Sequence, residues 1–518
     1  MELSKKLFFA VNRSFFQKFL KFDFFRNYKE YIFIFFKENP AFFFGLNILL
    51  GAALYFDFNF LIFFLILFFN IFFIRKYFLS LLIVFFGFFL SMSKYPDIKK
   101  IDKPIYGKGT FKILNIKKTN QFKKNLYQYK CKIINFKTKE KRYKNISAKF
   151  YSPKKLKAAF LYELDGELYS SKKYSFILKS KNLPRPTKKI LSLTELRFQT
   201  KNKFFKYLKK NIKDKNVFHF LNAILLGDVD SSLLSFTFSK IGISHILAIS
   251  GFHFSILILF LYFFLKLIFP IKFSYIILLI LINIYFLFIG STPSIFRSYI
   301  MASLAIVANI IDRKYSPING LGAALFIMIF LDPMIYQNLG FQLSFLSCFA
   351  IFMIFPSVDG ILEKVIKKRT LNELQGFDYL SKKAYLILRF IKSSFSLTMS
   401  VNIALFLLLL YHFSKFPILS FFYNLFIPFL ITFVMFLIMI TLLILVFLPF
   451  LTKPLFFINS FFISLILKVI FNPPALLSFF IRIEKIPFEF LLFYLVIIFL
   501  ISIRCNIKKK SSILFNFI

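Results

Sequence analysis

The chain has 518 residues, of which 58% are hydrophobic, and its mean hydropathy is +0.70. Repeated apolar runs long enough to cross about 30 Å of hydrocarbon indicate a polytopic membrane protein and exclude an ordinary soluble one. The formal charge of +46 indicates a polyanionic or anionic-lipid partner. However, 85 Phe and no Trp also fit the residue usage of an AT-rich genome, which would raise the lysine content without any binding role.

Residues 1–40 are basic and aromatic and contain no small-residue cleavage site. They are expected to form a cytoplasmic amphipathic segment rather than a removable signal peptide. Residues 41–93 are expected to hold three transmembrane helices, because three apolar runs follow one another there. These runs are Ala41–Phe56, Phe58–Ile74 and Tyr77–Ser93. Arg75 and Lys76 lie in the second loop, so the positive-inside rule predicts a cytoplasmic N-terminus and an external position for the residues after Ser93.

Residues 94–215 are strongly basic, with 36 Lys/Arg against 8 Asp/Glu. Short blocks of alternating apolar and polar residues predict a small external β-domain, either a barrel or a sandwich. The blocks are Gly109–Ile116, Leu126–Phe136, Ile146–Tyr151 and Tyr174–Leu178, with Asp165-Gly166 among the turn-prone pieces between them. Lysines interleave with aromatic residues, a mixture typical of surfaces that bind single-stranded nucleic acid, although half of these aromatics should lie in the core. The aromatics are Tyr127, Tyr129, Phe136, Tyr143, Phe150, Tyr151 and Tyr174.

Residues 216–505 form a second membrane block. Phe218–Leu226 and Leu233–Ile249 are short and interrupted by Gly and Asp, which favours an interfacial or re-entrant hairpin. Nine clearer spans are predicted, for a total of 12 to 14 in a mainly α-helical bundle. They begin near Phe252, Phe273, Ile295, Ile318, Phe341, Phe395, Phe421, Leu455 and Phe488. The basic loop 364–392 and the tail 506–518 are expected in the cytoplasm.

Enzymatic and metal chemistry find little support in the sequence. His245 and His253 have no third histidine nearby, so we expect no metal site and no cofactor. Ser250-Gly251 lacks the Gly-x-Ser-x-Gly pattern, and no carboxylate is placed to orient a histidine. No catalytic residue is therefore expected, although a membrane-embedded hydrolase built on these residues stays open as an alternative. The three cysteines are scattered, which predicts no disulfide framework.

Four polar motifs stand against apolar runs, where each polar residue costs free energy unless it faces a cavity or a partner. They are Ser244–Phe254 (SHILAISGFHF), Ser291–Arg297 (STPSIFR), Asp332-Pro333 and Gly340–Phe345 (GFQLSF). Arg297, beside a Ser-Thr-Pro-Ser turn, suits a charge-assisted contact with phosphate. A lipid headgroup contact or an ion pair with Asp332 is the alternative. Gly340 is expected to permit a turn, with Gln342 and Ser344 opening the next helix.

These four motifs, in this order between Leu225 and Phe355, resemble the competence domain of the ComEC-type DNA-uptake proteins. The resemblance implies a channel of the bacterial inner membrane that passes single-stranded DNA into the cytoplasm during natural transformation. It also implies an oligonucleotide-binding-type barrel at residues 94–215, with closing strands between Asp165 and Leu178. The implied DNA path is lined by His245, Ser250, His253, Ser294, Arg297, Gln342 and Ser344.

Because no Gly-x-x-x-x-Gly-Lys-Ser/Thr loop is present, the resemblance implies a separate cytosolic helicase or ATPase motor together with single-strand-binding proteins. Many relatives carry a metallo-β-lactamase-like domain at the C-terminus. This sequence ends shortly after its last predicted span and has no His-x-His-x-Asp-His cluster, so we expect no nuclease. A secondary transporter or exporter of a smaller anion remains the main competing interpretation.

Overall fold

The computed structural model describes residues 22–57, 77–95, 104–121, 124–138, 142–172, 175–180, 182–229, 231–474, 479–484 and 486–515. The chain folds into two compact units, and each is described by itself. Unit 1 comprises Met1–Phe88, Tyr315–Phe416 and Phe480–Ile518, and unit 2 comprises Phe89–Lys314 and Pro417–Phe479. The predicted span Phe58–Ile74 and most of the predicted N-terminal segment lie outside the described residues.

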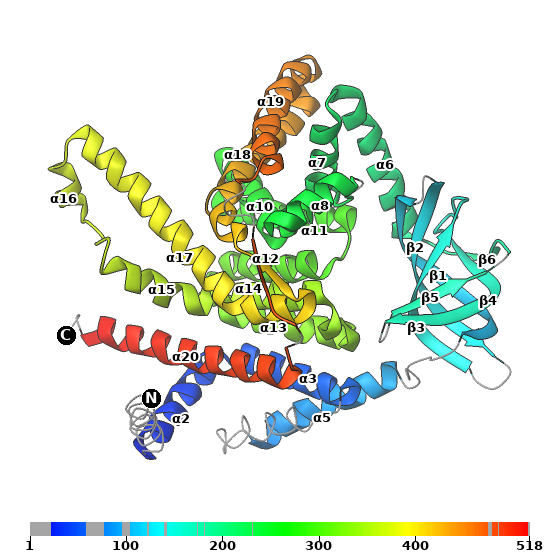
Figure 1. Ribbon diagram of the computed structural model, residues 1–518, viewed down its shortest axis with the longest axis horizontal. Helices are drawn as coiled ribbons and strands as arrows, with labels where there is room; N and C mark the ends of the chain where they lie inside the picture. The colour runs from blue at the N-terminus through cyan, green and yellow to red at the C-terminus, as the bar shows by residue number, and fades with distance from the viewer. Residues whose placement is uncertain are drawn as a thin grey trace, which may run out of the picture. The chain divides into compact units, whose positions relative to one another are not determined.

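The described residues form a mostly helical membrane protein with one β-barrel (Figure 1). Unit 1 contains α2 (Phe22–Glu38), α3 (Pro40–Phe56), most of α5 (Tyr77–Lys94), α13 (Pro317–Leu331), η2 (Pro333–Gln337), α14 (Leu339–Phe349), η3 (Ala350–Ile354), α15 (Phe355–Glu363), α16 (Leu371–Gln375), α17 (Tyr379–Phe413), β8 (Phe480–Arg482) and α20 (Phe488–Phe515). The short strand β7 (Lys415–Pro417) pairs with β8.

Unit 2 contains the barrel strands and the remaining helices. The strands are β1 (Ile105–Gln121), β2 (Lys124–Lys137), β3 (Arg142–Ser152), β4 (Phe160–Lys172), β5 (Ser175–Lys179) and β6 (Arg185–Lys189). The helices are α6 (Leu193–Asn211), α7 (Lys215–Leu226), α8 (Ser232–Ile241), α9 (Ser244–Leu247), α10 (Gly251–Ile268), α11 (Ile271–Ile289), α12 (Pro293–Ile310), α18 (Leu419–Phe447), η4 (Pro449–Leu451) and α19 (Thr452–Phe471).

Eight helical segments of the described residues are long and apolar enough to cross a membrane, or nine if a bent pair of helices counts as one span. They are Gly251–Ile268, Ile271–Ile289, Pro293–Ile310, Leu339–Glu363, Tyr379–Phe413, Leu419–Leu445, Pro449–Phe471 and Phe488–Ile507. These correspond to eight of the nine clear spans that the sequence predicted. The eight or nine candidate spans of the described residues are fewer than the 12 to 14 predicted for the whole chain. The predicted span near Ile318 is α13, which has only 15 residues.

Helix α13 packs closely against α3 through glycines of both helices. A Cβ placed on Gly45 would lie 2.5 Å from the Gly322 carbonyl oxygen, and one on Gly322 would lie 2.2 Å from the Phe42 Cα. The two backbones therefore approach as closely as small residues permit in packed membrane helices. Asn319 adds polar contacts at the helix start, because its Oδ1 accepts a hydrogen bond from the Ala41 N–H at 3.0 Å.

The β-domain is a closed barrel with strand order β1-β2-β3-β5-β4 and a further antiparallel pairing between β1 and β4 (Figure 1). All these neighbours are antiparallel except β3 and β5, which are parallel. This is the five-stranded arrangement of the oligonucleotide-binding fold, as the resemblance implied. Alternate residues of β1, β2 and β3 point inward and make up most of one hydrophobic core. Its fully enclosed members include Phe111, Ile113, Tyr129, Cys131 and Phe136.

One local prediction in this domain is wrong. Asp165 and Gly166 are not a turn between strands but lie in the middle of β4, where Gly166 pairs with Gly107 of β1. A Cβ on Gly166 would lie 2.3 Å from the Lys179 carbonyl oxygen of β5. Glycine is present here because β4 lies between β1 and β5 where the barrel closes, and the neighbouring backbone leaves no room for a side chain.

A buried carboxylate links the barrel to α6. Glu195 is 7% exposed, and its carboxylate accepts hydrogen bonds from the Ala158 N–H at 2.8 Å, Lys155 Nζ at 3.1 Å and Gln199 Nε2 at 3.2 Å. Burial disfavours the charged form, but these hydrogen bonds and the Lys155 charge outweigh it, so the pKa of Glu195 lies below its usual value.

We expect Glu195→Gln to destabilise the barrel and α6 by about 1–3 kcal/mol at neutral pH, because a buried ion pair loses one partner. Since the pKa is lowered by folding, the stabilisation is fully present above the unfolded pKa of about 4.3 and is lost as the pH falls through the lower folded-state value. Thermal unfolding of the full chain in detergent should therefore show a constant difference from wild type down to about pH 5. Glu163→Gln, which removes an exposed pair with Lys108, is the control. An equal effect of both variants would contradict this assignment.

Candidate nucleic-acid interface and membrane path

Four lysines form a compact basic surface on the outside of the barrel. Lys112 of β1 lies opposite Lys132 of β2, and Lys130 of β2 lies opposite Lys149 of β3. Lys130, Lys132 and Lys149 are exposed and Lys112 is half-buried. None of the four forms an ion pair with another described residue, whereas Lys108 and Lys117 pair with Glu163 and Asp228. We call these four residues the lysine ladder.

Like charges directly opposite one another destabilise a sheet, so two adjacent Lys–Lys pairs are costly unless an anion is bound.

The aromatic residues that interleave with lysine in the sequence and that the structure describes are buried or half-buried, whereas three of the four ladder lysines are exposed. Tyr129, Phe136 and Phe150 are buried in the barrel core, while Tyr127, Tyr143 and Tyr151 are half-buried. The outer face of β1 to β3 is therefore suited chiefly to electrostatic binding of a polyanion.

The predicted membrane motif around Ser250 begins helix α10. His253 occupies the third helical position, where its Nδ1 accepts a hydrogen bond from the Ser250 N–H at 3.1 Å. This leaves the ring proton on Nε2, which is buried and forms no hydrogen bond of normal geometry with a described residue. His253 thus caps the helix start from inside the protein. His245, on the short helix α9, is exposed.

Gly251 is the point where α10 meets α12. A Cβ added to it would lie 2.4 Å from Ser298 Oγ and 2.5 Å from Arg297 Nη2. Arg297 is only 6% exposed, and its Nη2 donates to Ser298 Oγ at 3.3 Å. Ser298 in turn donates to the Ser294 carbonyl oxygen at 2.9 Å. A buried guanidinium is thus held beside the first turn of α10, and the absence of a side chain at Gly251 makes the room for it.

The structure therefore brings six residues in or directly beside the predicted motifs into two contacting groups within unit 2. Ser250 contacts His253, and Gly251 contacts Arg297 and Ser298, with Ser294 one helical turn before Ser298. The two predicted path residues Gln342 and Ser344 belong to α14 of unit 1.

In unit 1, Gln342 is part of a polar network that sequence reasoning missed. Its Nε2 donates to the Tyr336 carbonyl oxygen at 3.0 Å, so its Oε1 is left to accept from His412 Nε2, also at 3.0 Å. The Tyr336 hydroxyl donates to Asp57 Oδ2 at 2.6 Å, and Gln337 Nε2 lies 3.2 Å from the same oxygen. This network connects the end of α3, η2, the start of α14 and the end of α17. His412 and Gln342 are 70 residues apart, so no local pattern signals their contact.

The predicted role of Gly340 as a turn residue is wrong, because Gly340 is the second residue of α14. Asn338 is the cap, and its Oδ1 accepts hydrogen bonds from the N–H groups of Gly340 and Phe341 at 2.9 and 3.4 Å. Asp332 caps η2 in the same way, accepting from the Met334 N–H at 3.2 Å. Ser344 is buried within α14.

The family profile described as "Competence protein" matches residues 230–506, which is more than half of the chain. The chain belongs to the competence protein family. Among curated proteins, ComE operon protein 3 of Bacillus subtilis (strain 168) is 25% identical over 178 residues, which are 31% of this chain and 23% of that protein. The match thus spans about a quarter of that relative. No solved structure matches this chain.

The competence-family match contains α10, α12, α14 and α17, and with them both polar groups described above except for Asp57 at the end of α3. The barrel precedes the matched residues. The lysine ladder therefore lies outside the residues that show the family, and any role for it has to be argued from this chain alone.

Proposed function

We propose that this chain is a channel that passes single-stranded DNA into the cytoplasm during natural transformation. Membership in the competence protein family supports a role in DNA uptake. The observation that carries the single-strand assignment is the lysine ladder on a barrel of oligonucleotide-binding type, because such barrels bind single strands through the outer face that includes strands 2 and 3.

In this proposal the protein lies in the bacterial inner membrane with the barrel outside and both termini in the cytoplasm. The charge distribution supports this orientation, because residues 364–392 hold eight Lys/Arg and only two Asp/Glu. The strand then passes from the barrel to a path that includes His245, Ser250, His253, Ser294, Arg297, Gln342 and Ser344. Arg297 is the best candidate for a phosphate contact, since its guanidinium is fixed in place by packing against Gly251.

The proposed partners are the DNA strand, the bilayer, a cytosolic helicase or ATPase that pulls the strand, and single-strand-binding proteins that receive it. The motor is proposed as a separate protein because the sequence has no phosphate-binding loop. We propose no hydrolytic step for this chain.

A deletion strain tests this function directly. Without the gene, cells given fluorescent duplex DNA should still bind label at the surface but should lose nuclease-protected label, and expression of the intact chain should restore it. A transformable host that lacks its own competence channel can replace the source bacterium. Unchanged protected label in the deletion strain would contradict the proposal and leave transport of a smaller anion as the better interpretation.

A further inference from the structure

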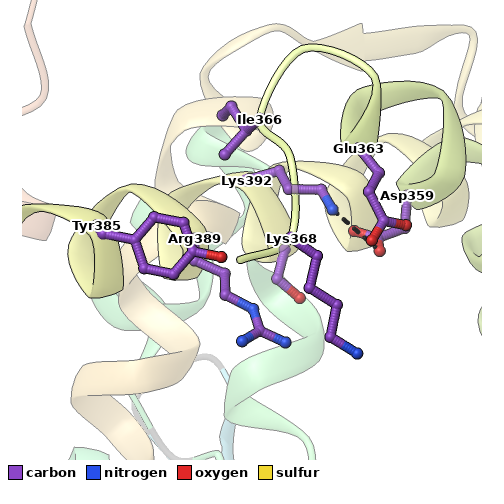
Figure 2. A pocket seen from close by; sticks show the side chains of 8 residues that line it. Asp359, Glu363, Ile366, Lys368, Tyr385, Arg389 and Lys392 are labelled. Carbon is purple, nitrogen blue, oxygen red and sulfur yellow. Dashed lines mark hydrogen bonds and ion pairs between the residues drawn. The ribbon is translucent and has the colours of Figure 1, made fainter. Parts of the chain in front are cut away.

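A second polar site lies in unit 1, between the end of α15 and the first half of α17. It is a cavity of about 200 Å³ whose lining includes Glu363, Lys368, Tyr385, Arg389 and Lys392 (Figure 2). At about 30 Å³ for each water in the liquid, the space would take roughly six waters, which is enough for a phosphate ester. The polar network of Gln342 and His412 is at the opposite end of α17, so this cavity is a separate site.

Two sets of contacts hold the walls of the cavity together. Lys392 Nζ pairs with Asp359 Oδ2 at 3.2 Å, and Ser396 Oγ donates to Asp359 Oδ1 at 3.1 Å, which fixes α15 against α17. The Tyr385 hydroxyl accepts from the Arg369 N–H at 2.9 Å and donates to the Lys367 carbonyl oxygen at 3.4 Å. One tyrosine thus bonds to the backbone on both sides of Lys368. The loop that carries Lys368 is thereby held on the helix that carries Arg389.

The cations of the cavity are not all neutralised. Figure 2 shows Lys392 directed at Asp359, while Lys368 and Arg389 extend in a common direction. Neither Lys368 nor Arg389 has an ion pair among the described residues, and both are exposed. A guanidinium offers a planar pair of donors to phosphate oxygens, and an ammonium adds a point charge. Glu363, which also lines the cavity, opposes anion binding.

The position of the cavity favours the phosphate of a phospholipid over that of a nucleic acid. The candidate spans Leu339–Glu363 and Tyr379–Phe413 both have their polar end here, so the cavity is at the level where a span meets the membrane surface. The same turns of α17 expose apolar side chains, among them Leu386, Ile387 and Phe390, at 58%, 60% and 41%. Aliphatic side chains such as Leu386 and Ile387 offer the bases of a nucleic acid no stacking surface, whereas they suit the acyl chains of a phospholipid.

We propose that this cavity binds the phosphate of an anionic glycerophospholipid, with Arg389 and Lys368 on the headgroup and the acyl chains against the exposed apolar side of α17. The bound lipid joins α15, the loop and α17 at the end of two spans. The inference is independent of what the protein transports. With the orientation proposed above, the lipid belongs to the inner leaflet.

The test uses the full-length chain in detergent and counts bound lipids by native mass spectrometry during titration with phosphatidylglycerol or zwitterionic phosphatidylcholine. Wild type should bind phosphatidylglycerol more tightly. The double variant Lys368→Gln/Arg389→Gln should lose at least about tenfold in affinity for it. The matched control Lys382→Gln/Lys383→Gln removes the same net charge from the first turns of α17, outside the cavity, and should change affinity by less than about threefold.

Two further variants separate the cavity from general charge attraction. Glu363→Gln should strengthen phosphatidylglycerol binding, because it removes the opposing carboxylate. Tyr385→Phe keeps every charge but releases the loop, and should weaken binding. Equal losses in the cavity and control double variants would overturn the proposal. So would one-for-one displacement of the lipid by a single-stranded oligonucleotide with the same sensitivity to Lys368 and Arg389, which would reassign the cavity to nucleic-acid phosphate.

Discussion

Arg297→Ala should abolish internalisation of labelled DNA while leaving surface binding and protein level unchanged. The guanidinium is buried at 6% exposure beside Gly251. In the proposed function, its removal would delete a charge-assisted contact with phosphate and would leave the barrel intact. Such contacts contribute about 1.5–3 kcal/mol, or roughly 10- to 100-fold in binding. Arg297→Lys should restore only part of the uptake, because an ammonium cannot reproduce the planar pair of donors. The measurement is nuclease-protected label per cell, with protein level determined by immunoblot.

Gly251→Ala tests the same site without removing any charge. The new methyl group would lie 2.5 Å from Arg297 Nη2 and 2.4 Å from Ser298 Oγ, so the guanidinium must move. Uptake should fall nearly as far as in Arg297→Ala. Gly376→Ala is the matched control, since its nearest neighbouring atom is 3.7 Å away, and Arg313→Ala controls for loss of one arginine just after the other end of α12. Normal uptake in both Gly251→Ala and Arg297→Ala would mean that the contact is purely structural.

Lys130→Gln/Lys132→Gln should weaken binding of single-stranded oligonucleotides to the full-length protein in nanodiscs, with little dependence on base sequence. Each removed phosphate contact should lower the slope of log affinity against log salt by about 0.7, so the double variant should lose about 1.4. Fluorescence anisotropy at several salt concentrations measures both quantities. The same variant should unfold at a slightly higher temperature, because Lys112 and Lys149 no longer face a like charge.

The control for this experiment is Lys188→Gln/Lys189→Gln on β6, which pairs with β4 and not with the strands of the lysine ladder. It removes the same net charge from the same barrel. An identical decrease in affinity and slope in both double variants would contradict a localised surface. Oligonucleotide binding would then depend only on the total charge of the barrel and not on the position of the lysines. This is the result expected if genome composition alone set the lysine content.

Sequence patterns predicted those parts of the fold that depend on local periodicity. The blocks around Gly109, Leu126 and Ile146 became β1 to β3 because alternate residues there face the core. The barrel closes through the pairing of β1 with β4, whose paired residues run from Ile105 with Leu168 to Lys112 with Leu161. The alternation of residues within a single strand carries no information about this long-range pairing. For the same reason Asp165-Gly166 was misread as a turn. The lysine ladder likewise requires strand register, which is fixed only when neighbouring strands pair.

The sequence likewise predicted some residues of the candidate site but not the contacts between them. Ser250, Gly251 and Arg297 were recognised from the sequence as unusual in apolar surroundings, but the contact between Gly251 and Arg297 comes from the crossing of α10 and α12. His253 stays a proposed residue of the DNA path, and the hydrogen bond from the Ser250 N–H gives its Nδ1 a capping role that the sequence did not indicate. His412 was passed over because its partner Gln342 is on another helix.

The close approach at Gly251 is one of many, and together they bear on how the gene tolerates mutation. A Cβ would meet another atom at less than 3.0 Å at ten of the 15 glycines. Glycine codons begin with two guanines, so an AT-rich genome, which would enrich Lys and Phe, would also make glycine scarce. Most of the glycines present are at positions where replacement would force a backbone or a neighbouring side chain to move, including Gly45, Gly166 and Gly322. In a sequence so rich in Lys and Phe, the few glycines indicate better than the common residues where helices and strands are in contact.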